Sequence, residues 1–350
     1  MDRHEKALAI LKAGTVIPAT PLALTENRQF DEKQQRFLTR YYLEAGSGGI
    51  ATAVHSTQFE IRDPEVNLFE TVIATVSDEI DRYEAETGKT IVKICGVCGK
   101  VEQALSEVAV AKKYGYDAVL LSPGGLKDLT EDEMIERTRK VAAEMPVIGF
   151  YLQPSVGGRL FSYSYWEQLC EIPNVVAIKC APFNRYLTND VVRACALSSR
   201  CDEITLYTGN DDNIVVDLLT DYTFTKNGKT VTKRFMGGLL GHWCVWTQKV
   251  VEMFPKLQGQ KATPELLTLA AEITDANGVV FDFANGFAGC IPGIHEILRR
   301  QGLLKGIWCL NPNEVLSPGQ AEEIDRIYEM YPHLTDDAFV KEYIKRHECV

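Results

Sequence analysis

A lysine and a tyrosine at the ends of two neighbouring strands are the best candidates for covalent chemistry in this chain. The apolar runs 147–154 and 175–180 are predicted strands that carry Tyr151 and Lys179, one strand–helix unit apart. Three apolar residues lead directly into Lys179, so burial would disfavour its charged form and lower its pKa. A neutral lysine amine attacks a ketone and forms an imine. We therefore predict that Lys179 is a Schiff-base nucleophile.

A protonated imine withdraws electrons from the adjacent carbon. A carbon–carbon bond can then break or form there, or water or ammonia can leave. Each step needs a proton carrier, and we predict that Tyr151 passes protons between the carbinolamine oxygen and the substrate. A 2-keto acid also needs a site for its carboxylate. The turn His55-Ser56-Thr57 offers hydroxyl and backbone N–H groups, and Gly209 completes the predicted substrate-binding set.

Eight apolar runs, separated by amphipathic helical patterns, predict the elements that position these residues. Because the strands are apolar almost throughout, we expect a parallel sheet covered on its outer face. Eight repeats favour an α/β fold of the (β/α)8 TIM-barrel type, in which the chemistry lies at the carboxyl ends of the strands. The predicted strands are residues 14–19, 49–54, 90–95, 118–122, 147–152, 175–180, 204–209 and 235–241.

The helical patterns and one hairpin signal define the domain organisation. Asn227-Gly228 between alternating residues predicts a β-hairpin insertion within 220–233. We divide the chain into a barrel, 1–258, and a C-terminal helical extension, 259–350. The helices predicted in the barrel are 34–44, 64–87, 101–114, 131–145, 163–170, 189–199 and 243–254, and those in the extension are 264–276, 281–301, 317–331 and 336–347.

Composition excludes several classes of protein. The 350 residues are 45% hydrophobic and carry a net charge of −11, which argues against a partner such as nucleic acid or an anionic membrane. No apolar run approaches the ~18 residues that cross a bilayer, and the charged N-terminus has no signal core behind it. The ten cysteines show no disulfide framework. These features predict a cytoplasmic protein.

Several motifs together resemble the dihydrodipicolinate synthase / N-acetylneuraminate lyase superfamily of class I, pyruvate-type aldolases. The resemblance runs from about residue 14 to the end of the chain. It implies a (β/α)8 barrel, Lys179 as the Schiff-base residue, Tyr151 as the proton-transfer residue, and a homotetramer (dimer of dimers) or homodimer. The motifs are Gly14-Thr-Val-Ile-Pro-Ala-Thr-Pro21, Tyr151-x-x-Pro154, Ile178-Lys179, Tyr207-Thr-Gly-Asn-Asp211 and the helical tail.

Three departures from the family pattern argue against a true dihydrodipicolinate synthase. The family carries Gly-Thr-Thr-Gly-Glu after the second strand, where this chain has His55-Ser-Thr-Gln-Phe59. Ser56 and Thr57 then take the threonine roles, or His55 and Ser56 do so if the register shifts by one. The paired tyrosines after the fourth strand are replaced by Gly124-Gly125, and an expected arginine is Val156. These changes favour a different aldehyde or leaving group.

We therefore predict a Schiff-base lyase or aldolase that acts on a 2-keto acid, either pyruvate or a pyruvate-derived adduct. It would need no metal and no cofactor beyond the imine on Lys179. Two alternatives remain: a dehydratase or deaminase that uses the same imine, and a catalytically lapsed barrel with a binding or regulatory role. His55 and His242 are further acid–base candidates, whereas Cys95-x-x-Cys98 is a weak redox or metal signal and Asp211-Asp212 is better explained by loop capping.

Overall fold

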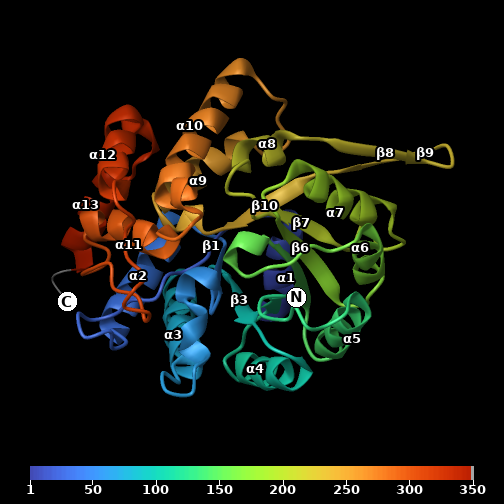
Figure 1. Cartoon of the computed structure of the whole chain (residues 1–350), viewed down its shortest axis with the longest axis horizontal. Coiled ribbons are helices and arrows are strands. Elements are labelled where there is room, and N and C mark those ends of the chain that lie inside the picture. The colour runs from blue at the N-terminus through green and yellow to red at the C-terminus, as the bar shows by residue number, and fades with distance from the viewer. Residues whose placement is uncertain (348–350) are drawn as a thin grey trace.

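Eight parallel strands form the barrel at the centre of the computed structural model, which describes residues 1–347 (Figure 1). They follow the order β1-β10-β7-β6-β5-β4-β3-β2, and a bridge between Ala19 and Ala51 joins the two ends of this sheet. The predicted (β/α)8 barrel is therefore confirmed. The strands are β1 Val16–Pro18, β2 Gly49–Thr52, β3 Val92–Val97, β4 Ala118–Leu121, β5 Val147–Leu152, β6 Val175–Ala181, β7 Thr205–Thr208 and β10 Phe235–Leu240.

Helices cover the outside of the barrel, which explains why almost every strand residue is buried. The caps expected from the sequence are present: Thr130 forms a capping box with Glu133, and Ser162 accepts a hydrogen bond from the backbone N–H of Tyr165. The covering helices are α2 Glu32–Ala45, α3 Phe69–Thr87, α4 Val101–Lys113, α5 Glu131–Ala142, α6 Tyr163–Cys170, α7 Arg185–Leu197, α8 Ile214–Leu219 and α9 Thr247–Met253.

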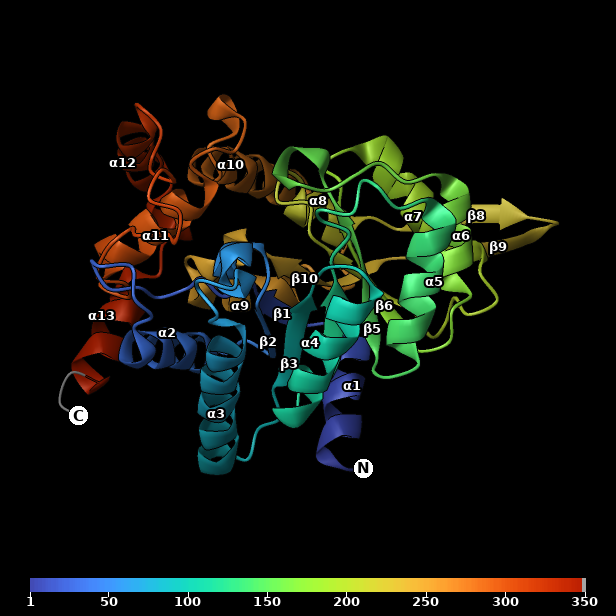
Figure 2. The same cartoon turned by 60° about the horizontal axis from the view of Figure 1, so that its bottom comes forward.

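An N-terminal helix that the sequence analysis missed, α1 (Arg3–Ala13), closes the amino end of the barrel (Figure 2). The hydroxyl of Tyr207, on β7, donates to the carbonyl of Leu11 at 2.8 Å. The local signal for this helix was a capping box between Asp2 and Glu5. Because α1 closes this end, access to the barrel interior is left to the opposite end, where the strands finish.

The C-terminal extension contains α10 Pro264–Val280, α11 Cys290–Gln301, α12 Gln320–Met330 and α13 Asp337–His347. The prediction of one helix over 281–301 was wrong in its first part. The chain leaves the helical path at Asp282, whose φ is 58°, and the Asp282 carboxylate accepts a hydrogen bond from the backbone N–H of Gly289 at 2.8 Å. This break turns residues 281–289 back toward the barrel.

The predicted hairpin is present as β8 (Tyr222–Lys226) and β9 (Lys229–Lys233), which pair antiparallel and project from the barrel (Figure 1). Asn227 and Gly228 at its tip both have positive φ, as a two-residue turn of this kind requires. Short 3-10 turns complete the structure: η1 His55–Thr57, η2 Phe59–Arg62, η3 Pro154–Val156, η4 His242–Cys244, η5 Phe254–Lys256, η6 Phe283–Asn285 and η7 Pro332–Leu334.

Two further findings concern the membrane and the cysteines. No helix within residues 1–347 combines the length and the apolar character needed to cross a bilayer. The nine cysteines in the same range are free thiols. The tenth, Cys349, lies outside the described residues.

A buried hydrogen bond between the barrel and the extension should contribute measurably to stability. The hydroxyl of Tyr41 donates to the Asp336 carboxylate at 2.6 Å and accepts from the backbone N–H of Thr247. Tyr41→Phe removes the hydrogen-bond partner of the Asp336 carboxylate oxygen and of the Thr247 N–H. We therefore expect the free energy of unfolding to fall by about 1–3 kcal/mol in urea titrations. Tyr114→Phe, which removes a surface hydroxyl, is the control and should change it by less than about 0.5 kcal/mol.

Candidate active site

Lys179 reaches into a cavity of about 60 Å³ at the carboxyl ends of the barrel strands. Its side chain is only 8% exposed, because strand β6 places it inside the barrel mouth. Gly209, at the end of β7, makes room for it: a Cβ at this position would lie 2.7 Å from Cε of Lys179. The glycine predicted as a substrate-binding residue therefore has a steric role beside the lysine.

Burial determines the protonation of this amine. Desolvation lowers the pKa of Lys179 from 10.5 to about 8, although the nearby carboxyl of Asp211 and thiol of Cys244 act in the opposite direction. At pH 7 about a tenth of the amine is then neutral. This fraction is several hundred times larger than that of a solvated lysine, and only the neutral amine can attack a carbonyl group.

Asp211 is the second ionisable group in the same cavity, and the sequence analysis did not include it in the site. It is 5% exposed, and its Oδ1 accepts a hydrogen bond from the backbone N–H of His242 at 2.9 Å. Burial raises its pKa to about 7, against the effects of that hydrogen bond and of the Lys179 charge. A carboxyl group that titrates near neutral pH can both take and return a proton during a reaction.

The turn after β2 forms one wall of the cavity with His55 and Ser56. Ala53 and Gln58, on either side of it, hold left-handed backbone with φ of 60° and 68°, an unusual conformation for residues other than glycine. Such residues occur often at functional sites.

The hydroxyl groups of this turn point toward the backbone of the first strand's loop. Ser56 donates to the carbonyl of Ala19, and Thr57 donates to the carbonyl of Thr20 at 2.7 Å. Among the described residues, no acceptor is found for the backbone N–H groups of His55 and Ser56. These two N–H groups, rather than the hydroxyl protons, are therefore available to hold an anion.

The ring of His55 lies at the cavity wall as a neutral group. Burial, with a smaller contribution from the positive charge of Lys179, lowers its pKa to about 4. At neutral pH the imidazole can donate one hydrogen bond and accept another, but it carries no charge.

Tyr151 does not lie in this cavity, contrary to its predicted place beside Lys179. In the β5–β6 register Phe150 is the partner of Lys179, and Tyr151 is the partner of Cys180. Successive side chains of a strand point to opposite faces, so Tyr151 faces the helices. Its ring packs at 4.9 Å from that of Trp166, and its hydroxyl accepts a hydrogen bond from the backbone of Phe161.

Phe150 occupies the inward position instead. The centroid of its ring lies 4.6 Å from Nζ of Lys179. The Tyr-x-x-Pro spacing placed Tyr151 by its distance from Pro154 along the chain, but this spacing does not determine which of two adjacent strand residues faces inward. Among the described residues no tyrosine lines the cavity, and Lys179 has an apolar ring and a carboxyl group as neighbours there.

Arg159 and the pair Cys95 and Cys98 lie away from the cavity. Arg159 donates to the carbonyls of Leu126 and Leu129, at 3.1 and 2.6 Å, and so holds the loop after β4. Burial raises the thiol pKa of Cys95 and Cys98, which is the opposite of what an activated cysteine needs. Within residues 1–347 no group of three or more His, Cys, Asp or Glu side chains is placed to hold a metal ion.

Several phenylalanines complete the cavity, and the sequence analysis did not single them out. Phe183 follows β6, whereas Phe281 and Phe287 come from the break after α10. Phe183 was visible as a residue just beyond a strand end. Nothing local in the sequence indicates that residues about 100 positions later would cover Lys179, because this contact depends on how the extension folds back.

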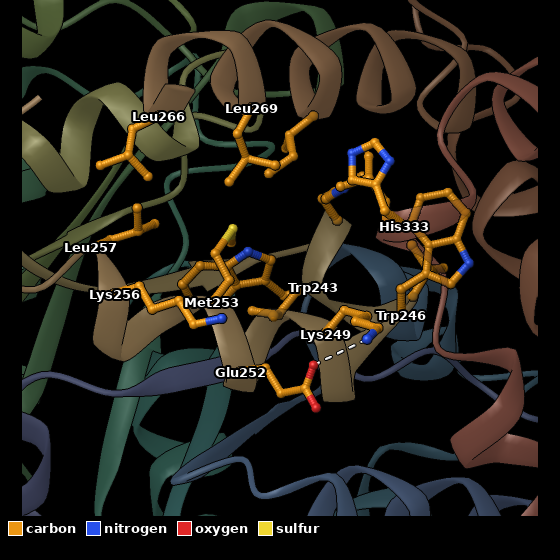
Figure 3. A pocket seen from close by; sticks show the side chains of 15 residues that line it. Trp243, Trp246, Lys249, Glu252, Met253, Lys256, Leu257, Leu266, Leu269 and His333 are labelled. Carbon is orange, nitrogen blue, oxygen red and sulfur yellow. Dashed lines mark hydrogen bonds and ion pairs between the residues drawn. The ribbon is translucent and has the colours of Figure 1, made fainter. Parts of the chain in front are cut away.

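A second cleft, of about 240 Å³, lies outside the barrel between α9 and α10 (Figure 3). Leu266 and Leu269 of α10 form one wall, and Met253 of α9 faces them. Two lysines line it, Lys249 and Lys256, and Lys249 is paired with Glu252 at 3.1 Å. Lys179 and Asp211 both lie elsewhere, so we assign the candidate chemistry to the smaller cavity.

Comparisons with known proteins agree with this architecture. A model of the "Dihydrodipicolinate synthetase family" matches residues 12–237. A chloride-inhibited dihydrodipicolinate synthase from Acinetobacter baumannii, complexed with pyruvate, is similar with a TM-score of 0.72 and 19% identity, over 91% of this chain and 98% of that one. N-acetylneuraminate lyase from Fusobacterium nucleatum is similar with a TM-score of 0.70 and 16% identity, over 91% and 99%. These identities establish a shared fold alone. The search among curated proteins gives no match.

Removing the buried amine should make the protein more stable at neutral pH. The pKa of Lys179 is 10.5 in the unfolded chain and about 8 in the folded one, so the unfolded chain binds more protons between these values and stability rises with pH there. Below pH 8 the folded protein bears the full cost of the buried charge, roughly 3 kcal/mol. We expect Lys179→Met to unfold at higher urea concentration than the wild type at pH 7, by an amount that shrinks as the pH approaches 10.

Lys93 provides the matched control, because it is also buried but its ammonium group donates to Asp81 and Ser77. Burial lowers the pKa of Lys93 as well, but Asp81 opposes that shift, so Lys93→Met should raise the free energy of unfolding at pH 7 by less than Lys179→Met does. If Lys179→Met is less stable than the wild type at pH 7, the buried amine does not lower the free energy of unfolding and the prediction is wrong.

Proposed function

Since this chain belongs to the dihydrodipicolinate synthetase family, we propose that it is a Schiff-base lyase acting on a 2-keto acid, pyruvate or a pyruvate-derived adduct, through an imine on Lys179. The observation that carries the proposal is a buried lysine of lowered pKa in a cavity at the strand ends, with a carboxyl group that titrates near pH 7 beside it. The imine itself withdraws the electrons, so the proposal needs no metal and no further cofactor.

In the cleavage direction the substrate is a 4-hydroxy-2-keto acid. The amine of Lys179 adds to the C2 ketone, water leaves, and a protonated imine forms. A base takes the proton of the C4 hydroxyl, the C3–C4 bond breaks, and its electron pair moves to the imine nitrogen. The aldehyde departs, the remaining enamine takes a proton at C3, and water hydrolyses the imine to release pyruvate and the free amine.

We assign the proton transfers to Asp211, in place of Tyr151. Asp211 shares the cavity with Lys179, and each group affects the charge of the other. The hydroxyl of Tyr151 is engaged by the backbone of Phe161 on the far side of β5. With a pKa of about 7, Asp211 is suited to both directions of proton transfer, since a catalytic acid–base works best when its pKa is close to the working pH.

The carboxylate of the 2-keto acid is held, in this proposal, by the backbone N–H groups of His55 and Ser56. The hydroxyls of Ser56 and Thr57 fix that turn to the backbone of residues 19 and 20. A site made of backbone donors carries no charge of its own, so it adds little to the positive charge that already disfavours burial of Lys179. From the resemblance to the superfamily we also propose a homotetramer (dimer of dimers) or homodimer, located in the cytoplasm.

Borohydride reduction in the presence of pyruvate tests the imine. We expect a mass increase equal to one reduced pyruvate adduct per chain, located on the peptide that contains Lys179 and absent from Lys179→Met. The peptide with Lys93, the other buried lysine, is the internal control and should remain unmodified. If no adduct forms on Lys179, the chain is not an imine enzyme, and the catalytically lapsed barrel becomes the better explanation. Release of pyruvate from 4-hydroxy-2-keto acids then separates a lyase from a dehydratase or deaminase.

Replacing Asp211 should slow turnover without disturbing the fold. Asp211→Asn keeps an oxygen that can accept from the backbone of His242, but it cannot carry a proton, so we expect turnover to fall by ~10²-fold or more. Steady-state kinetics should show little change for Tyr151→Phe, because that hydroxyl accepts from the backbone of Phe161 on the other side of β5. A large loss in Tyr151→Phe together with full activity in Asp211→Asn would reverse our assignment.

A further inference from the structure

The cavity of Lys179 adjoins a larger cleft of about 650 Å³ that opens to solvent. The two spaces share Gln153, Phe183 and Phe287 as wall residues, so these side chains stand between the inner and the outer space. A molecule covalently attached to Lys179 can extend past them into this outer cleft. The walls of the cleft therefore contact whatever part of the substrate lies beyond the keto acid.

The two phenylalanines at this junction are held in an unusual conformation. Phe183 and Phe287 have φ of 51° and 72°, in the left-handed region that bulky residues rarely adopt. Their rings contact edge to face, with centroids 5.9 Å apart and planes at 70°. The backbone N–H of Phe183 donates to the side chain of Asn210 at 3.1 Å, which fixes its position. Such backbone persists where the surrounding structure enforces it, and it is common at ligand-binding sites.

Two large apolar side chains of the outer cleft are exposed to solvent. Leu160 is 62% exposed and Phe283 is 69% exposed, and both line this cleft. The ring of Phe283 contacts that of Phe287, with centroids 5.8 Å apart. A single exposed apolar residue needs no explanation, but several that meet at the entrance of one cavity indicate an apolar ligand.

Charges in the two spaces do not suit an anionic ligand. Among the described residues that line them, Lys179 is the only lysine or arginine. Arg185, close to the cleft, is paired with Asp212 and with Asp217, at 3.3 and 2.9 Å. A carboxylate or phosphate on the leaving half of the substrate would meet Asp212 and no free cation. The outer cleft thus disfavours charged aldehydes.

Two of its polar side chains, Thr274 and Asn184, are engaged within the protein, whereas Nδ2 of Asn277 is buried there without a hydrogen-bond partner among residues 1–347. The hydroxyl of Thr274 donates to the carbonyl of Asp212 at 3.0 Å. The side-chain oxygen of Asn184 accepts from the backbone of Leu187 at the start of α7. The walls are otherwise mostly apolar, so a polyhydroxy ligand placed here would regain only part of the hydrogen bonds that it makes to water.

We propose that the outer cleft is a subsite for an apolar, uncharged aldehyde, of which an aromatic aldehyde is the best match. This inference rests on the proposed function, since it concerns the half of the substrate that is released. In the condensation direction the enamine of pyruvate on Lys179 forms a bond from its methyl carbon to the aldehyde carbon. The aldehyde oxygen receives the proton of Asp211, and water hydrolyses the imine to release a 4-hydroxy-2-keto acid.

The experiment supplies pyruvate with one aldehyde at a time: benzaldehyde, the anionic succinic semialdehyde, or glyceraldehyde. Product formation is followed by mass spectrometry, and borohydride trapping with pyruvate alone is run beside it. We expect kcat/KM for benzaldehyde to exceed both other values by about tenfold or more, as apolar pockets discriminate by such factors. If pyruvate is trapped but an anionic or polyhydroxy aldehyde is preferred, or no aldehyde reacts, the subsite is wrong. If pyruvate is not trapped, the proposed function fails and the subsite with it.

Two variants and one control variant test the subsite further. Phe283→Ser changes an exposed side chain and should leave the fold and the pyruvate adduct intact, while KM for benzaldehyde rises about fivefold or more. Leu267→Ser, an exposed apolar residue of α10 outside the cleft, is the matched control and should leave KM unchanged. Val156→Arg adds a cation to the cavity wall and should raise kcat/KM for succinic semialdehyde relative to benzaldehyde. Unchanged selectivity in both Phe283→Ser and Val156→Arg would contradict the proposal.

Discussion

The burial of the Lys179 amine determines how the rest of the active site is arranged. A lysine held 8% exposed at a barrel mouth loses most of its hydration, and its charged form is destabilised. The negative charge of Asp211 offsets part of the lost hydration energy. Within residues 1–347, however, Lys179 has no hydrogen-bonded ion pair like the one between Lys93 and Asp81. The fold therefore leaves the charged amine with little compensation for its lost hydration. Such a loss of stability is common at reactive sites. The glycine at position 209 and the apolar ring of Phe150 are part of the same arrangement, since each leaves the amine close to atoms that cannot solvate it.

Much of this architecture could be predicted because it follows from local pattern. Apolar strands alternating with capped helices indicate a barrel, and Asn227-Gly228 indicates a hairpin. Lys179 was recognisable because an apolar strand ends on it. The orientation of Tyr151 could not be predicted in this way. Phe150 and Tyr151 are adjacent aromatic residues on β5, and a spacing motif cannot determine which of them faces inward. The role of Asp211 was missed for a similar reason: carboxylates in a loop after a strand usually cap the next helix, and only the folded structure shows that this one is buried.

The extension was predicted as helical, but its contribution to the cavity was not. A helix was expected to run through 281–301, whereas the chain breaks at Asp282 and returns Phe281 and Phe287 to the barrel mouth. That break depends on the Asp282 carboxylate, which also accepts the hydroxyl of Ser317. A tertiary contact of this kind overrides the local helical pattern, and no window of neighbouring residues contains both partners.

The covering of the cavity by residues near 281–294 has a consequence for the order of events during synthesis. A growing chain that has completed all eight strands still lacks Phe287 and Ile294, so two of the side chains that line the Lys179 cavity are not yet in place. The complete cavity, and with it the full desolvation of the amine, then forms only once the last quarter of the polypeptide has folded over the barrel. Unfinished chains would thereby be spared premature reactions with the carbonyl metabolites around the ribosome.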